Sequence, residues 1–125
     1  MAKTILIVDD SVSLRKVVAI ALTGAGYEVV EAGDGLDALD KLAGMGGRKV
    51  HLIISDVNMP RMGGIEFVRQ VKTNASYKFT PVIMLTTEGQ DNMKEQGRAA
   101  GAKAWILKPF NPPQMLNAVA KLILP

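Results

Sequence analysis

A chain of 125 residues is long enough for one domain with one core and too short for two ordinary domains. Its hydrophobic content of 48% excludes a disordered chain, and the absence of cysteine excludes a disulfide framework and a thiolate metal site. The net charge of +3 is spread thinly, with no Lys/Arg run longer than two and no pattern of stacking aromatic residues, so it does not indicate nucleic-acid binding.

The first apolar segment, Thr4–Val8, is too short for a signal peptide or a membrane span. We therefore expect a cytoplasmic protein without membrane contact. The segment is β-branched and apolar throughout, which predicts a buried strand. Ser11 or Ser13 can serve as the N-cap of a following helix. The apolar face of that helix would consist of Leu14, Val17, Val18, Ala21 and Leu22.

The same alternation of strand and helix continues to the end of the chain. The further expected elements are strands over 27–32, 52–56, 81–85 and 103–107, with helices over 36–43, from 63–64 onward, over 91–100 and after Asn111. The helix over 91–100 is the weakest, because Gly97 in its middle costs about 1 kcal/mol relative to alanine. Five strands that alternate with five helices predict an α/β fold, with one parallel sheet covered by helices on both faces.

Polar side chains follow four of the predicted strands at the point where each strand ends. They are Asp9 and Asp10 after the first strand, Asp56 on the third, Thr86 on the fourth and Lys108 on the fifth. Because parallel strands end at one edge of a sheet, we expect these side chains to lie together. Three carboxylates repel one another unless a cation joins them, and such oxygen ligands suit Mg²⁺ beside a phosphoryl group. A carboxylate can also be the nucleophile that forms an aspartyl-phosphate.

Each of these residues also has a simpler interpretation. Asp56 could cap a turn, Asp9 and Asp10 could cap the first helix, and Thr86 could be an ordinary strand residue. Lys108 could be solvated at the surface. Four such coincidences at four strand ends are improbable, whereas His51, at the opposite edge of the sheet, is better explained by a structural role.

Four motifs together resemble the response-regulator receiver family over the whole chain, most of all its single-domain chemotaxis members. These motifs are Val8-Asp9-Asp10, Asp56-Val57-Asn58-Met59-Pro60-Arg61-Met62-Gly63-Gly64, Leu85-Thr86-Thr87-Glu88 and Lys108-Pro109-Phe110. The resemblance implies a flavodoxin-like (βα)5 fold with strand order 2-1-3-4-5. It also implies one receiver domain over residues 1–125, with no output domain.

The resemblance further implies the role of each site residue. Asp56 would accept a phosphoryl group from a phosphohistidine of a sensor histidine kinase. Mg²⁺ would be held by the side chains of Asp10 and Asp56, by the backbone carbonyl of Asn58, and by Asp9 largely through water. Thr86, Lys108 and the Thr87 backbone N–H would bind the phosphoryl oxygens. Asn58 and Glu88 would tune the lifetime of the aspartyl-phosphate. The Lys108-Pro109 peptide bond would be cis.

Trp105 stands where the family usually has Tyr or Phe as a switch residue, which changes the expected geometry of switching but not the chemistry. The implied partners are a chemotaxis-type sensor kinase, a flagellar motor switch protein and a phosphatase. We expect a monomer that signals through the fourth helix, fifth strand and fifth helix, and that catalyses only its own phosphorylation and dephosphorylation.

Three alternatives stay open. A single-domain receiver could serve a phosphorelay other than chemotaxis. A flavodoxin would share the fold, but it needs a hydroxyl- and glycine-rich phosphate loop where this chain has Asp9-Asp10-Ser11. A phosphatase of the haloacid dehalogenase type would have an early Asp-x-Asp motif, and Asp56-Val57-Asn58 lacks the second acid.

Overall fold

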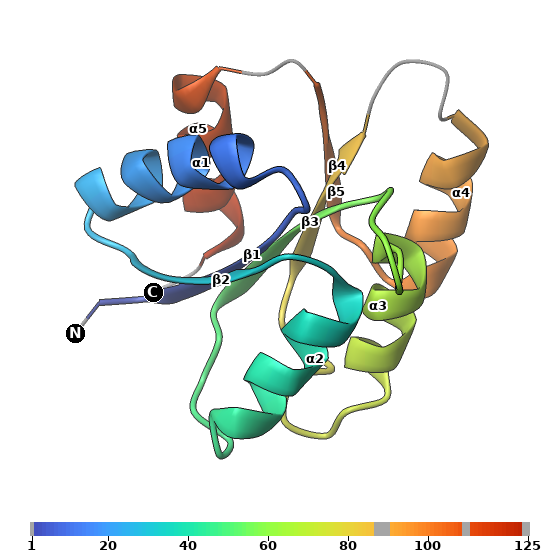
Figure 1. The fold of residues 1–125 in the computed structure, drawn as a ribbon. Coiled ribbons are helices and arrows are strands. Elements are labelled where there is room, and N and C mark those ends of the chain that lie inside the picture. Colours follow the sequence, from blue (N-terminus) through green and yellow to red (C-terminus); the bar gives the residue numbers. More distant parts are fainter. Residues whose placement is uncertain (1, 87–90, 109–110, 124–125) are drawn as a thin grey trace.

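The computed structural model describes residues 2–86, 91–108 and 111–123, without the side chains of 91–93. Strands and helices alternate along the described chain (Figure 1). They are β1 (Thr4–Val8), α1 (Val12–Gly24), β2 (Glu28–Ala32), α2 (Gly35–Gly44), β3 (Leu52–Asp56), α3 (Gly64–Lys72), β4 (Val82–Thr86), α4 (Asp91–Ala100), β5 (Ala104–Leu107) and α5 (Pro112–Leu122).

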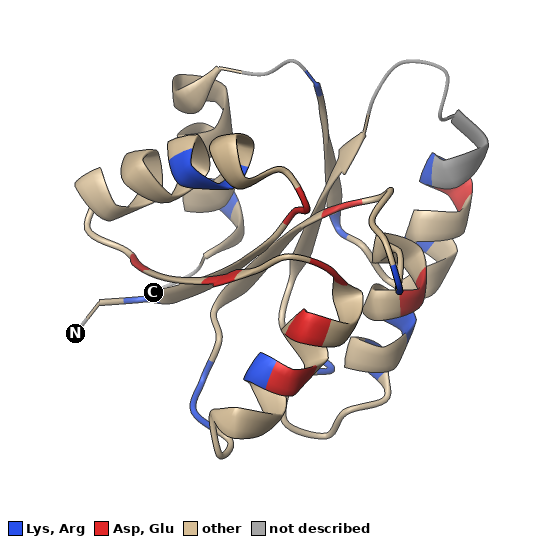
Figure 2. Ribbon diagram, in the orientation of Figure 1, with Lys and Arg blue, Asp and Glu red and all other residues tan. Residues whose placement is uncertain are grey.

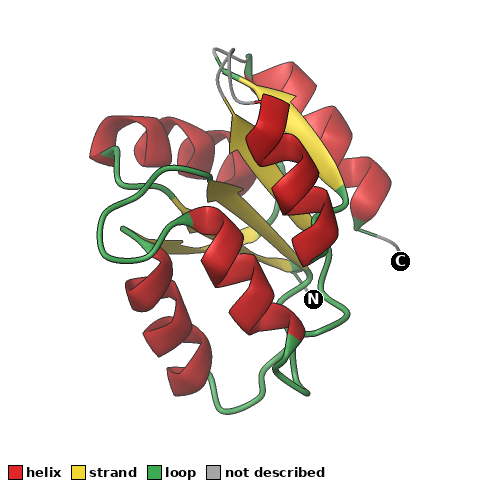
Figure 3. Ribbon diagram, turned by 90° about the vertical axis from the view of Figure 1, so that its right-hand side faces the viewer, coloured by secondary structure: helices red, strands yellow, loops and turns green. Residues whose placement is uncertain are grey.

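The strands form one parallel sheet in the order β2-β1-β3-β4-β5. Helices α1 and α5 cover one face of the sheet, and α2, α3 and α4 cover the other (Figures 1 and 3). A separate hydrophobic core fills the space on each face, one including Phe67 and Val68 and the other including Leu22 and Met115. The predicted fold class and strand order are confirmed.

Burial on both faces explains the continuous apolar runs of the central strands. Every residue of β1 is buried, and so are the first four residues of β3. Only Asp56, the last residue of β3, is partly exposed. The strand therefore delivers one carboxylate to the edge of the sheet, which is where ligands bind in open α/β folds.

Side-chain hydrogen bonds cap the starts of α1, α2 and α5. Ser11 accepts a hydrogen bond from the Leu14 backbone N–H at the start of α1, so Ser11 rather than Ser13 is the N-cap. Asn111 caps α5 in the same way by accepting from the Gln114 N–H. Such caps are worth about 1 kcal/mol each, because they satisfy an N–H that the helix itself cannot.

The structure corrects the predicted face of α1. Val17 is 50% exposed, whereas Val18 and Leu22 are almost completely buried. The sequence contained two overlapping apolar stripes at helical spacing, and only the stripe with Val18 and Leu22 faces the sheet. In the described part of the chain, no helix is long and apolar enough to cross a membrane.

Candidate functional site

The strand register brings the predicted polar residues to one edge of the sheet. Val8 pairs with Ser55, so Asp9 and Asp56 follow at the same level on neighbouring strands. Thr86 pairs with Leu107, so Lys108 follows one residue beyond the Thr86 level. The Lys108 backbone N–H also donates to the Thr86 carbonyl oxygen over 2.6 Å, which extends the pairing of β4 and β5 by one bond.

Three carboxylates meet at this edge. One oxygen each of Asp9, Asp10 and Asp56 lies within 4.8 Å of the other two, and acidic positions mark the adjoining ends of β1 and β3 in Figure 2. Asp9 is buried, Asp56 is half-buried and Asp10 is exposed. The cluster is thus closed towards the core and open to solvent at Asp10.

Lys108 lies between two of these carboxylates. Its Nζ is 3.2 Å from Asp56 Oδ2 and 3.4 Å from Asp9 Oδ2. The other oxygen of each carboxylate accepts a backbone hydrogen bond, from the Ser11 N–H to Asp9 Oδ1 at 2.9 Å and from the Val57 N–H to Asp56 Oδ1 at 2.8 Å. The interpretation of Lys108 as a solvated surface residue is therefore wrong.

Burial raises the pKa of Asp56 above its usual value, and the nearby charge of Asp9 raises it further. The positive charge of the Lys108 ammonium lowers the pKa of Asp56, because it stabilises the ionised carboxylate. A half-buried carboxylate with two acidic neighbours and one ammonium gains from a further cation. The donors are all hard oxygens, which fits Mg²⁺, and the residues that could hold it are Asp9, Asp10 and Asp56.

The loop after β3 contains Asn58, whose backbone carbonyl is a predicted metal ligand. Asn58 lies two residues beyond Asp56, and its side chain is exposed. Thr86, the predicted phosphoryl ligand, is buried at the end of β4. Thr87, Glu88 and the Lys108-Pro109 peptide bond lie outside the described residues, so their predicted roles and the predicted cis bond stay predictions.

Trp105 packs on the side of the sheet that α3 and α4 cover. The ring is half-buried, and its Nε1 is buried without a hydrogen-bond partner among the described residues. The Arg98 guanidinium of α4 lies 5.5 Å from the ring centroid, and Gly97 is the α4 residue next to Nε1. The predicted switch residue is therefore packed against α4.

Sequence reasoning missed two ion pairs beside the site, one formed by Arg15 and one formed by Arg61. Arg15 donates to the backbone carbonyl of Asp9 at 2.7 Å and pairs with Glu31. Arg61, in the loop after β3, forms an ion pair with Asp34 at the start of α2. In the sequence, Asp34 precedes Gly35 as in a turn and Arg61 follows Pro60, and neither pattern indicates that the two segments meet.

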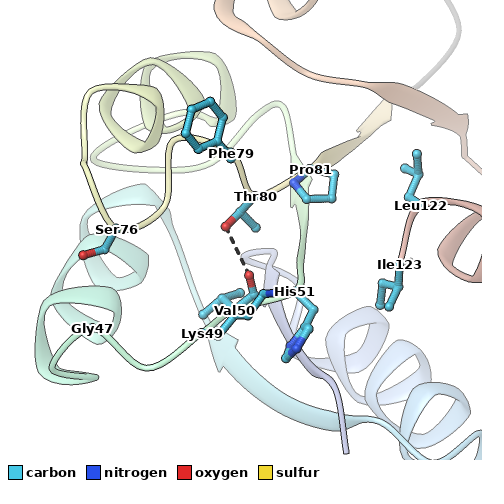
Figure 4. Close-up of a pocket in the computed structure, with 10 residues that line it drawn as sticks. All are labelled: Gly47, Lys49, Val50, His51, Ser76, Phe79, Thr80, Pro81, Leu122 and Ile123. Carbon is cyan, nitrogen blue, oxygen red and sulfur yellow. Dashed lines mark hydrogen bonds between the residues drawn. The ribbon is translucent and has the colours of Figure 1, made fainter. Parts of the chain in front are cut away.

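An open groove lies at the opposite edge of the sheet and contains none of the predicted site residues (Figure 4). His51 is one of its lining residues, and its Nδ1 accepts a hydrogen bond from the Thr4 N–H at 3.0 Å. Burial and the charges of Lys3 and Lys49 lower the pKa of His51, so the imidazole is neutral at pH 7. The hydrogen bond to Thr4 fits the structural role predicted for His51.

A five-stranded parallel sheet with a carboxylate cluster and a lysine at the carboxyl ends of its strands defines the class of protein, and the family comparison agrees. The model of the response regulator receiver domain matches residues 5–120, so the chain belongs to the response-regulator receiver family. Receiver domains are generally Mg²⁺-dependent and interact with sensor histidine kinases. The flavodoxin and haloacid dehalogenase alternatives are therefore set aside.

Two curated relatives and one solved structure show the range of similar proteins. The chain is 38% identical over 121 residues to the chemotaxis protein CheY1 of Helicobacter pylori (strain ATCC 700392 / 26695), covering 96% of this chain and 95% of that protein. It is 40% identical over 116 residues to the phosphate regulon transcriptional regulatory protein PhoB of Pseudomonas aeruginosa, covering 93% of this chain but 49% of PhoB. The structure of the chemotaxis response regulator CheY4 of Vibrio cholerae superposes with a TM-score of 0.90 at 46% identity, covering 98% of this chain and 99% of that one.

Proposed function

We propose that Asp56 accepts a phosphoryl group from a phosphohistidine of a sensor histidine kinase in a Mg²⁺-dependent reaction, and that the phosphorylated protein signals by binding a partner. The observation that carries this proposal is the position of Asp56. It is the half-buried carboxylate of the cluster that Lys108 contacts at 3.2 Å, and it ends the central strand β3. No other described carboxylate combines these features.

In the proposed reaction, one Asp56 carboxylate oxygen forms a bond to phosphorus while the bond from phosphorus to the histidine nitrogen breaks. The electron pair of the broken bond stays on the imidazole, which leaves protonated or takes a proton from water. The Val57 N–H already holds Asp56 Oδ1 at 2.8 Å and fixes the plane of the carboxylate. A bound Mg²⁺ would neutralise charge on the phosphoryl oxygens.

Lys108 changes partner in this scheme. Its ammonium, now 3.2 Å from Asp56 Oδ2, is close enough to bind an oxygen of a phosphoryl group on Asp56. The Thr86 hydroxyl and the Thr87 backbone N–H would donate to the other oxygens. Asp10, Asp56 and the Asn58 carbonyl would hold the metal, with Asp9 acting largely through water, and Asn58 and Glu88 would adjust how long the aspartyl-phosphate lasts.

We assign the chain to chemotaxis, with a CheA-like kinase as its phosphodonor and a flagellar motor switch protein as its target. Support comes from CheY1 and CheY4, which are named as chemotaxis proteins and match this chain over nearly their whole length. PhoB, named as a transcriptional regulatory protein, supports the alternative of a different phosphorelay. We further propose that the protein turns over no separate substrate. The expected monomeric state, cytoplasmic location and dedicated phosphatase stay predictions.

We propose that α4, β5 and α5 form the surface that binds the partner. Trp105 of β5 lies against α4, so a change at the site could reach this surface through the ring. Helix α4 carries Gly97 in its middle and has few candidates for a buried face, and elements of low local stability are those that shift in signalling. Hydrogen exchange should show α4 opening sooner than α5 and changing on activation.

The test of the proposal is phosphorylation by acetyl phosphate, followed by intact mass. The wild-type protein should gain one phosphoryl group with Mg²⁺ and none with EDTA, and Asp56→Asn should gain none in either condition. Asp10→Asn should need more Mg²⁺, because a charged ligand is lost. Full modification of Asp56→Asn would place the nucleophile on another residue.

A second experiment separates the two pathways. The protein is loaded with Mg²⁺ and fluoroberyllate, which stands in for the phosphoryl group, and is used to capture partners from the source organism. Recovery of a flagellar motor switch protein would support chemotaxis. Recovery of a phosphotransferase of a relay would support the alternative.

A further inference from the structure

The loop that joins β3 to α3 is closed at its base. The Gly64 N–H donates to the Val57 carbonyl oxygen at 2.8 Å, so the six residues 58–63 form a short loop between these two points. At Gly64 a Cβ atom would collide with the carbonyl oxygen of Asp56. The loop, which contains Asn58, is therefore built directly against the backbone of the proposed phosphoacceptor.

The tip of this loop is bound to the start of α2. Arg61 Nε donates to Asp34 Oδ2 at 2.8 Å and Arg61 Nη2 donates to Asp34 Oδ1 at 3.0 Å, which is a bidentate ion pair. The Gly35 N–H donates to the Met62 carbonyl oxygen at 3.1 Å. The Met62 side chain also lies so close that a Cβ at Gly35 would come within 2.7 Å of its Cγ.

Asp34, the partner of Arg61, is itself held in place by the fold. It is 7% exposed, and it caps α2 by accepting a hydrogen bond from the Asp37 N–H at 2.9 Å. Two residues before it, the Ala32 carbonyl accepts from the Asp9 N–H at 3.1 Å. The turn that contains Asp34 therefore connects the loop after β3 to the backbone of Asp9, one of the three clustered acidic residues.

The backbone of Arg61 adopts a conformation that an isolated arginine avoids. Its φ is +61°, and it is the one non-glycine residue with positive φ in the described ranges. A residue with a Cβ keeps this conformation only where its surroundings fix it, and such residues cluster at functional sites. Here the ion pair with Asp34 and the 2.6 Å hydrogen bond from the Met62 N–H to the Pro60 carbonyl fix it.

We propose that Arg61 is a positioning residue for the metal site: by clamping the 58–63 loop to Asp34, it presents the Asn58 carbonyl to Mg²⁺ and so sets the affinity for the metal. The inference rests on the proposed function, because it takes Mg²⁺ as the ligand. Arg61 itself touches neither the metal nor the phosphoryl group.

Charge and positioning make opposite predictions for the loss of Arg61. Removing a positive charge near a cation site strengthens binding of the cation by Coulomb's law. Releasing the loop weakens it, because the Asn58 carbonyl is no longer held in place. Outer-shell partners typically change metal affinity by about 10–100-fold, and since Asn58 supplies one neutral ligand, we expect a loss of about five- to tenfold.

The experiment is a Mg²⁺ titration of the full chain, followed by backbone amide chemical shifts and by calorimetry. Arg61→Ala and Arg61→Gly should both bind Mg²⁺ about five- to tenfold more weakly, and Arg61→Lys should recover part of the loss through one remaining hydrogen bond. The matched control is Arg69→Ala, which removes an equally exposed arginine paired with Glu66 on α3. Its Mg²⁺ affinity should be unchanged or slightly higher.

Arg61→Gly distinguishes the effect of the ion pair from that of backbone strain. The variant loses the ion pair, but glycine adopts a positive φ without cost. Normal affinity in Arg61→Gly would overturn the inference, and so would normal or tighter binding in Arg61→Ala with an unchanged far-UV spectrum. If the wild-type protein itself bound no Mg²⁺, the proposed function would fail as well, which distinguishes the two failures.

Discussion

The Nζ of Lys108 lies 3.2 Å from Oδ2 of Asp56, so a lysine is the counter-ion of the proposed phosphoacceptor. The same ammonium is 3.4 Å from Oδ2 of Asp9. One positive charge therefore serves two carboxylates that are largely withdrawn from solvent. Lys108 and a divalent cation are competitors for these oxygens until a phosphoryl group arrives.

Lys108→Ala should bind Mg²⁺ more tightly and be phosphorylated more slowly. The repulsion between two unit charges about 4 Å apart is roughly 1 kcal/mol even at the dielectric constant of water, so the affinity should rise at least about fivefold. Phosphorylation should slow because the donor to the phosphoryl oxygens is lost. Calorimetry and acetyl phosphate kinetics measure the two effects. Lys103→Ala, an exposed lysine at the other end of β5, is the control, and equal Mg²⁺ affinity in all three proteins would contradict the competition.

Asp56→Asn should stabilise the metal-free protein at pH 7. Burial raises the pKa of Asp56 in the folded state, so between the unfolded and folded pKa values the native state binds more protons than the unfolded state. The free energy of unfolding contributed by this group therefore falls as the pH rises through that window. Urea unfolding should show the largest advantage of the variant near pH 7 and little below about pH 3.9. Excess Mg²⁺ should reduce the advantage, and a variant less stable than wild type at pH 7 without Mg²⁺ would refute the argument.

Gly64→Ala should destabilise the fold strongly, because the new methyl group would collide with the Asp56 carbonyl oxygen and approach Met84 Cε to 2.9 Å. Overpacking of a core costs about 1–3 kcal/mol, and a collision with backbone should reach at least the upper part of that range. Gly44→Ala is the matched control, since nothing lies within 4 Å of its added methyl group. That change should stabilise α2 by roughly 0.5–1 kcal/mol. Chemical denaturation measures both, and similar stabilities would contradict the close approach at Gly64.

Trp105 should report occupation of Asp56. A phosphoryl group adds about −1.5 to −2 charge units, and the Thr86 hydroxyl is expected to move towards it and leave space for the ring. The ring starts half-buried, with Nε1 unpaired among the described residues, so a small displacement should change its emission and its quenching by iodide. Trp105 is the only tryptophan, which gives the emission a single source. No change in either signal with fluoroberyllate and Mg²⁺ bound would place the switch elsewhere.

The sheet and its polar edge were predictable because they depend on short-range patterns. Runs such as Leu52-Ile53-Ile54 mark strands buried on both faces, and the alternation with helices makes the sheet parallel. Once the strands are parallel, Asp9 and Asp56 must end at one edge.

Other features depend on tertiary contacts that no local pattern encodes. One of the two contacts that hold Arg61 at positive φ is its pair with Asp34, which is 27 residues away in the sequence. Val17 is exposed because of the orientation of α1 about its own axis on the sheet. The sequence of α1 contains two apolar stripes, and either could have faced the core. Lys108 was placed correctly at the edge, but its position between two carboxylates required side-chain geometry.

The most direct test of the account is chemical trapping of the phosphorylated residue. The protein is phosphorylated with acetyl phosphate and Mg²⁺, reduced with borohydride, which converts an aspartyl-phosphate to homoserine, and digested for peptide mass spectrometry. We predict homoserine at position 56 in the wild-type protein, and none there when Mg²⁺ is replaced by EDTA. Homoserine at Asp9, Asp10 or another acid, with Asp56 unmodified, would contradict the assignment of Asp56 as the phosphoacceptor.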